Sequence, residues 1–217
     1  KIFTSSFVTY DYLTMTSPQT SRNIQGKPSD LPVGRLPAAN VAEAKLLIDK
    51  TLAYYNQLPN QSTPCGDWRM KLDFVVDDDL QNESPPSGIA FHTAADNAIK
   101  FNFEGSSSDK PEYNVRKLYL DSYPATNSAG GQRYPQVNQA ISSDVSNSLF
   151  LFYFGHGGIN GWSQERVLTS TEVKNFNNYN SVYSRFPLVS TITCEFTLWD
   201  DPSANSTGEQ VIKSKIG

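Results

Sequence analysis

Runs of apolar residues alternate with amphipathic segments along most of the chain, and these two patterns predict strands and helices in turn. Residues 149–154 are apolar at every position, as expected for a strand that is buried on both faces of a sheet, and residues 187–193 predict another buried strand. Two further strands are predicted at residues 68–76 and 115–120. Strands that alternate with helices indicate an α/β domain with a mainly parallel sheet.

The helical segments are predicted by apolar residues that recur every three or four positions and by residues that can cap a helix. The first helix should follow Asn40, where Glu43 can complete a capping box, and its apolar face should run from Val41 to Tyr55. Near the N-terminus, residues 2–10 are rich in β-forming residues, and residues 31–37 predict a short strand closed by proline. The other predicted helices lie at residues 89–101, 135–146, 172–176 and 208–215.

Composition and charge narrow the class of protein. With 217 residues the chain is long enough for one well-packed domain, and we predict a single domain over residues 1–217. The net charge is -4, and the basic residues are scattered among acidic ones. We therefore expect no nucleic-acid partner, because such a protein needs a basic surface to neutralise phosphates. Cys65 and Cys194 could form one disulfide at most, and with only two histidines they lack the spacing of a structural zinc site.

The ends of the two long apolar runs carry chemically unusual residues. Residues 149–154 lead into a Gly-His-Gly-Gly turn at 155–158, and residues 187–193 lead into Cys194. In open parallel sheets, ligands bind beyond the carboxyl ends of the strands. If the two strands are neighbours, His156 and Cys194 lie side by side at this edge, and the 38 positions between them leave room for a crossover helix.

A cysteine and a histidine in this arrangement suit nucleophilic catalysis. The thiolate is the reactive form of cysteine, and a free thiol with a pKa of about 8.5 needs a nearby base. His156 can act as that base and later protonate a leaving amine. The backbone N–H groups of Gly157 and Cys194 could donate to the oxyanion that forms during the reaction. The structural alternative stays open, since a cysteine at a strand end is often a core residue and a Gly-His-Gly segment is often only a turn.

Two rival interpretations of these residues are poorly supported. A dinucleotide-binding fingerprint would need a third glycine at position 160, where Asn160 stands, and an acidic residue at the end of the next strand. The G-x-S-x-G motif of serine hydrolases does not occur in the sequence. Trp162, Glu195 and Trp199 lie just past the two turns and are candidates for lining a substrate cleft, with core or loop packing as the alternative for the tryptophans.

Several motifs, in order along the chain, resemble the gingipain family of caspase-like cysteine peptidases. The segments that carry the resemblance are VGRLP at 33–37, GDWR at 66–69, FGHGG at 154–158, TCEF at 193–196, DDP at 200–202 and GEQ at 208–210. Within the family the chain is most similar to the C-terminal signal peptidases and sortases of the type IX secretion system. The resemblance covers residues 31 to the end and implies a caspase-like three-layer sandwich, in which helices flank a mainly parallel central sheet.

The resemblance also implies a catalytic site. His156 and Cys194 would form the dyad, and gingipains place an acidic residue behind the histidine, which corresponds here to Asp77 or Asp78. The alternative for the aspartate run at 77–79 is a solvated loop or a set of structural calcium ligands. Apart from that possible calcium, no cofactor or metal is expected. Arginine specificity is not expected either, because no acidic residue stands just before His92.

The activity implied by the resemblance is the removal of a C-terminal sorting domain from secreted cargo proteins. The acyl group would then pass to water or to the amine of a surface polysaccharide, at the outer face of a bacterial outer membrane and beside other components of the secretion system. A general gingipain-like endopeptidase, and a non-catalytic caspase-like module that binds secretion partners, are the alternatives. Because the family's chain continues beyond the position of Gly217, we expect these residues to be a fragment of a longer protein.

Overall fold

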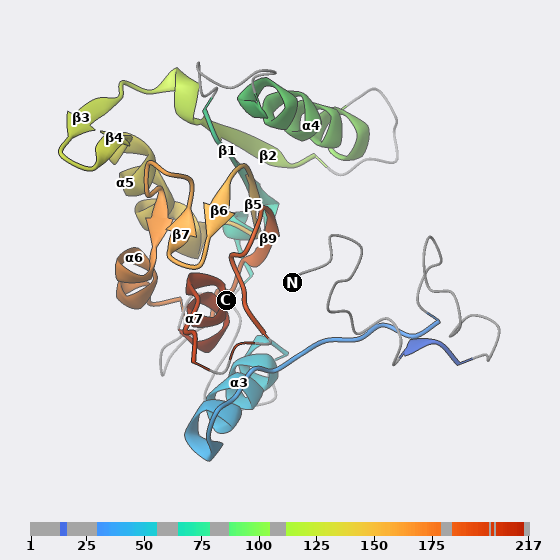
Figure 1. The fold of residues 1–217 in the computed structure, drawn as a ribbon. Helices are drawn as coiled ribbons and strands as arrows, with labels where there is room; N and C mark the ends of the chain where they lie inside the picture. Colours follow the sequence, from blue (N-terminus) through green and yellow to red (C-terminus); the bar gives the residue numbers. More distant parts are fainter. Residues whose placement is uncertain are drawn as a thin grey trace. The chain divides into compact units, whose positions relative to one another are not determined.

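The computed structural model describes residues 14–16, 30–55, 65–78, 87–104, 112–178, 184–199, 201 and 203–214 (Figure 1). Contacts divide the chain into two compact units, residues 1–37 and 38–217, and every helix and strand discussed below belongs to the second. The single domain expected over residues 1–217 stays a prediction. The β-rich run expected at residues 2–10 lies outside the described residues.

Four parallel strands form the central sheet, in the order β2-β1-β5-β9 (Figure 1). They are β1 (Lys71–Val76), β2 (Asn114–Tyr119), β5 (Phe150–Phe154) and β9 (Leu188–Ile192). The runs at residues 149–154 and 187–193 therefore contain β5 and β9. The burial expected of the second run was wrong, because β9 ends the described sheet and its residues are exposed or half-buried. The α/β fold with a mainly parallel sheet is confirmed.

Helices pack on both faces of this sheet. Successive side chains of a strand point to opposite faces, so each face has its own apolar cluster. One apolar cluster contains residues of α4 (Ser87–Asn102) and of one sheet face, with Leu72, Phe74, Val76, Ala95 and Ile99 among its buried members. The other cluster contains residues of α5 (Pro135–Asp144) and of the opposite face, with Val75, Val137, Ile141, Leu151 and Tyr153 among its buried members. The three-layer arrangement is confirmed, and it explains why β5 is apolar on both faces.

Shorter elements complete the described fold. A hairpin of β3 and β4 precedes α5, and β6, β7 and β8 form a small antiparallel sheet after β5. None of the described helices has the length and apolar character needed to span a membrane. The bounds are α3 (Val41–Tyr54), η1 (Asp67–Met70), η2 (Leu120–Ser122), β3 (Thr126–Ser128), β4 (Gly131–Arg133), η3 (Val145–Asn147), β6 (Gly157–Gly158), β7 (Gly161–Trp162), β8 (Leu168–Thr169), α6 (Ser170–Asn175) and α7 (Thr207–Lys213).

Two expected strands differ from the structure. Residues 32–38 form no strand, so the prediction for residues 31–37 was wrong; prolines at positions 32 and 37 lack the N–H group that a sheet partner would need. The strand expected from residue 68 begins only at Lys71, because Asp67–Met70 forms a 3₁₀ turn that buries Trp68.

The helix expected after Asn40 is present as α3, but only part of its expected apolar face is buried. The Asn40 side chain accepts a hydrogen bond from the Glu43 backbone N–H, as expected of an N-cap. Val41 and Tyr55, the two ends of the expected apolar face, are exposed. The buried residues are Leu47, Lys50 and Ala53.

The buried side chain of Lys50 has hydrogen-bond partners in the interior. Its Nζ donates to the carbonyl oxygens of Ile212 (2.7 Å) and Ser214 (2.8 Å), near the C-terminal end of α7. Carbonyl groups at the end of a helix lack partners within that helix, so a buried ammonium can satisfy them. Burial lowers the pKa of Lys50 to about 7.

Candidate active site

The carboxyl ends of β1, β5 and β9 meet at one edge of the sheet, and each is followed by a candidate residue: Asp77, His156 or Cys194. The chain runs outward from β1 to β2 and returns on the other side of β1 as β5. The strand order thus reverses between β1 and β5, and such a switch point is where ligands bind in open α/β sheets. The expectation that β5 and β9 are neighbours is confirmed.

Backbone contacts join the turn after β5 to the turn after β9. The Gly155 N–H donates to the Ile192 carbonyl oxygen at 3.2 Å. A Cβ atom at Gly157 would overlap the Thr193 hydroxyl and lie 3.1 Å from the Cys194 carbonyl oxygen. Only a residue without a side chain allows this approach. The segments that carry His156 and Cys194 are therefore in direct contact.

The two side chains of the predicted dyad are accessible. Cys194 is exposed and forms no disulfide, and Cys65 is also exposed and free. His156 is half-buried, and its ring packs nearly perpendicular to that of Phe91 of α4, with 5.3 Å between ring centroids. Glu195 has a φ of 47°, a left-handed conformation that is uncommon outside glycine and often found at functional sites. The catalytic pairing of Cys194 with His156 stays a prediction.

Of the two candidate aspartates, Asp77 contacts the histidine turn. It is buried, and its Oδ2 accepts a hydrogen bond from the His156 backbone N–H at 2.8 Å. The Tyr153 hydroxyl donates to the His156 carbonyl oxygen at 2.6 Å and lies 3.3 Å from the same Asp77 oxygen. Asp78 is turned to another partner, since its Oδ2 accepts from the Tyr134 hydroxyl at 2.7 Å.

Burial changes the pKa of the Asp77 carboxyl. Loss of solvent around the carboxyl raises the pKa of Asp77 to about 6, although the hydrogen bond from the His156 N–H opposes this rise. The nearby carboxylates of Asp78 and Glu165 raise it further. A carboxyl group with a pKa near neutrality changes charge under conditions in which peptidases work.

We expect the stability difference between the wild-type chain and an Asp77→Asn variant to change with pH. Below the ordinary pKa of 3.8 the Asp77 carboxyl is protonated in both the folded and the unfolded state. Its stabilising contribution to the free energy of unfolding is then fully present. As pH rises towards 6 the unfolded state ionises first, and roughly 3 kcal/mol of that contribution is lost. Urea unfolding of both proteins from about pH 4 to pH 7 in metal-free buffer measures this difference.

Asp96 provides a control with the opposite sign. Hydrogen bonds from Lys117 and Tyr119 lower the pKa of Asp96, so its contribution is lost only as pH falls below the ordinary pKa of 3.8. The stability difference between the wild type and Asp96→Asn should therefore stay nearly constant from about pH 4 to pH 7. A wild-type advantage over Asp77→Asn that does not change across this pH range would contradict the assignment for Asp77.

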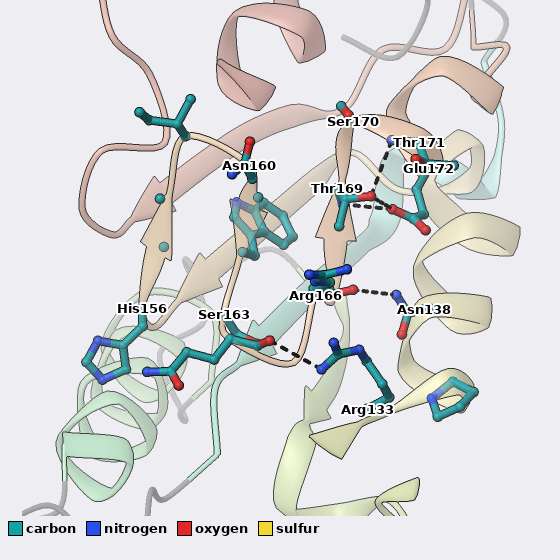
Figure 2. Close-up of a pocket in the computed structure, with 17 residues that line it drawn as sticks. Arg133, Asn138, His156, Asn160, Ser163, Arg166, Thr169, Ser170, Thr171 and Glu172 are labelled. Atoms are coloured by element: carbon teal, nitrogen blue, oxygen red, sulfur yellow. Dashed lines mark hydrogen bonds between the residues drawn. The ribbon is translucent and has the colours of Figure 1, made fainter. Parts of the chain in front are cut away.

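A groove of about 1080 Å³ opens beside His156 (Figure 2). Figure 2 shows His156 at one end, the start of α6 at the other, and the side chains of Arg133 and Arg166 between them. Asn138 of α5 also lines the groove, and its amide donates a hydrogen bond to the carbonyl oxygen of Arg166 at 2.9 Å. At the far end, Thr169 and Glu172 form the capping box of α6. An extended segment of a substrate could lie in this groove and reach the histidine.

The residues expected to line a cleft have different surroundings. Trp162 belongs to the lining of the groove, but its side chain is fully buried and its ring stacks on Tyr153 at 4.4 Å between centroids, so core packing dominates. Glu195 is exposed and Trp199 is half-buried, and neither lines this groove. Sequence reasoning missed Arg133, at the end of β4, and Arg166, in the turn between β7 and β8, because an isolated arginine carries no pattern that separates a site from a solvated surface.

A three-layer α/β fold with a histidine and a free cysteine at adjoining strand ends is the arrangement of a caspase-like cysteine peptidase. The model of peptidase family C25 matches residues 2–217, and the chain belongs to this family, that of the gingipains. Membership supports a cysteine peptidase function. Comparisons with curated proteins and with solved structures gave no match.

Proposed function

We propose that the chain is a cysteine endopeptidase with Cys194 as the nucleophile and His156 as the acid and base. The contact between the two strand-end turns, at Gly155 and Gly157, is the observation that carries this proposal. It favours a shared site because it brings the backbone segments that carry the two residues together at one edge of the sheet.

The reaction would proceed in two steps. The Cys194 thiolate attacks the carbonyl carbon of the scissile peptide, the C–N bond breaks, and His156 gives its proton to the leaving amine. The resulting thioester is then attacked by water or by an amine, which loses a proton to His156 and releases the thiolate. The N–H groups of Gly157 and Cys194 would stabilise the oxyanion in both steps. Asp77 would act as a positioning residue, through its hydrogen bond to the His156 backbone.

The finer proposal concerns the substrate. The motifs of this chain resemble PorU, the C-terminal signal peptidase and sortase of the type IX secretion system, and we propose the same role. The substrate would be a secreted cargo protein that carries a C-terminal sorting domain. The acceptor would be water or the amine of a surface polysaccharide, and the site of action would be the outer face of the bacterial outer membrane, beside other secretion components.

Incubation of the chain with a cargo protein that carries a sorting domain, with and without an excess of an amine acceptor, tests this proposal by mass spectrometry. We expect loss of the sorting domain, a hydrolysed product without the amine and an amide-linked product with it. Cys194→Ala should give neither product. Cys65→Ala, which removes the other exposed thiol, should behave like the wild type.

Each alternative gives a different result in this assay. Full processing by Cys194→Ala would contradict the assignment of the nucleophile. Equal cleavage of proteins without a sorting domain would contradict the proposed substrate and favour a general endopeptidase. A hydrolysed product alone in excess amine would contradict acyl transfer.

A further inference from the structure

The groove beside His156 carries positive charge, although the chain as a whole has a net charge of -4. Arg133, at the end of β4, and Arg166, in the turn between β7 and β8, both line it (Figure 2). Glu172 is the one acidic residue among the described residues of the lining, and its carboxylate accepts the Thr169 N–H at 2.8 Å in the capping box of α6. The two arginines therefore set the charge of the groove.

Neither arginine has an acidic partner within the chain. The ion pairs of the described ranges include no bond from Arg133 or Arg166 to a carboxylate. Arg133 is half-buried, and its guanidinium donates to the carbonyl oxygens of Gly130 at 2.8 Å and Gln164 at 3.4 Å. Carbonyl oxygens are neutral, so they fix the position of the guanidinium without cancelling its charge.

The turn that carries Arg166 has an unusual backbone conformation. Ser163 and Arg166 have φ angles of 54° and 57°, in the left-handed region that is uncommon outside glycine and often found at functional sites. Between them, Glu165 is buried, lies outside the lining of the groove and accepts the Ser163 hydroxyl at 2.8 Å. The turn thus presents Arg166 to the groove and keeps the neighbouring acid away from it.

The groove lies on the side of the histidine. His156 belongs to its lining, and Cys194 does not. In the proposed reaction Cys194 keeps the acyl part of the substrate, and His156 gives its proton to the leaving amine. The part of the substrate nearest to His156 is therefore the leaving segment, which follows the scissile bond in the sequence of the substrate.

We propose that Arg133 and Arg166 bind an acidic side chain of the substrate, on the C-terminal side of the scissile bond. This inference rests on the proposed peptidase function and adds a substrate preference to it. A guanidinium suits a carboxylate because it can donate two parallel hydrogen bonds to it. A lysine or arginine of the substrate would be repelled at the same place.

Cleavage of a peptide library from a digested proteome, read by mass spectrometry, tests this preference without assuming a cleavage site. We expect Asp and Glu to be enriched at a position after the cleaved bond. One cleaved peptide, and its version with Gln in place of that Glu, then give two values of kcat/KM. The wild type should favour the Glu peptide about tenfold, the effect of a charge-assisted hydrogen bond.

Variants of the arginines assign the preference to the groove. Arg133→Gln should lower the ratio of the two kcat/KM values to near one, and Arg166→Gln should lower it about threefold, because Arg166 is exposed and solvent screens its charge. The rate with the Gln peptide should change little, whereas a structural defect would slow both peptides. Lys174→Gln removes a charge from an exposed residue of α6 outside the lining and should keep the wild-type ratio.

Capture of the same library on immobilised Cys194→Ala separates this inference from the proposed function. If the wild type cleaves no peptide, the proposed function fails, but captured peptides enriched in Asp and Glu, with the enrichment lost in a Cys194→Ala, Arg133→Gln double variant, would still support the arginine site. No acidic preference in either assay would overturn the proposal. So would a preference for acidic residues before the scissile bond, or a ratio that both arginine variants leave unchanged.

Discussion

Replacing His156 with alanine is expected to lower kcat/KM for cleavage of a sorting-domain substrate by about 100- to 10,000-fold. The variant would lose both the base that generates the Cys194 thiolate and the acid that protonates the leaving amine. The ring is half-buried and lies at the edge of the sheet, so its loss should leave the core intact. Initial rates for the wild type and the variant, with circular dichroism as a check of the fold, measure the effect.

The other histidine of the chain provides the matched control. His92 lies in α4, its ring stacks on Tyr119 at 5.0 Å between centroids, and its Nε2 is 3.0 Å from the Asp77 carbonyl oxygen. His92→Gln can keep that hydrogen bond and should retain nearly full activity. Wild-type kcat/KM in His156→Ala, or an equal loss in His92→Gln, would contradict the role given to His156.

A methyl group at Gly157 is expected to lower kcat/KM about 100-fold, because a displacement of about 1 Å at a catalytic site can cost this much. The Cβ of Gly157→Ala would overlap the Thr193 hydroxyl and crowd the Cys194 carbonyl oxygen, 3.1 Å away. Relief of these contacts must move the two turns apart. The loss should appear in kcat, measured in steady state, because the change affects the reacting groups more than the groove.

Gly158 is the natural control for Gly157, since the two glycines are adjacent. A Cβ at Gly158 would meet no heavy atom within 4 Å, so Gly158→Ala should keep nearly wild-type kcat and stability. Equal activity of the two variants would mean that the contact between the turns does not control the reaction. Thermal unfolding of both variants separates loss of activity from loss of fold.

The parts of the fold that could be predicted from the sequence are those set by local pattern. The apolar run that forms β5 is recognisable because a strand covered on both faces needs no polar side. The same reasoning failed for the burial of β9, whose residues are exposed or half-buried. The Gly-His-Gly-Gly turn and Cys194 stand out because a polar or reactive residue directly after such a run is unusual. Placing them at one edge needed only the rule that parallel strands end at the same side of a sheet.

The parts that could not be predicted depend on partners distant in the chain. Lys50 can be buried because two carbonyl oxygens near the end of α7 accept hydrogen bonds from its Nζ, and no helical pattern reveals this. Glu165 sits in a polar segment that resembles a solvated turn, and only the tertiary fold brings it to Asp77 and Asp78. The choice between these aspartates also required the fold, because it depends on which one accepts the His156 N–H.

The rate at which Cys194 is alkylated tests the central claim, that His156 activates this thiol, most directly. Iodoacetamide labelling from about pH 5 to pH 9, read by mass spectrometry, gives separate rates for Cys194 and Cys65, which are both exposed. We predict that Cys194 reacts faster than Cys65 near neutral pH and that His156→Ala slows Cys194 alone. Equal rates for the two thiols, unchanged by His156→Ala, would contradict the pairing.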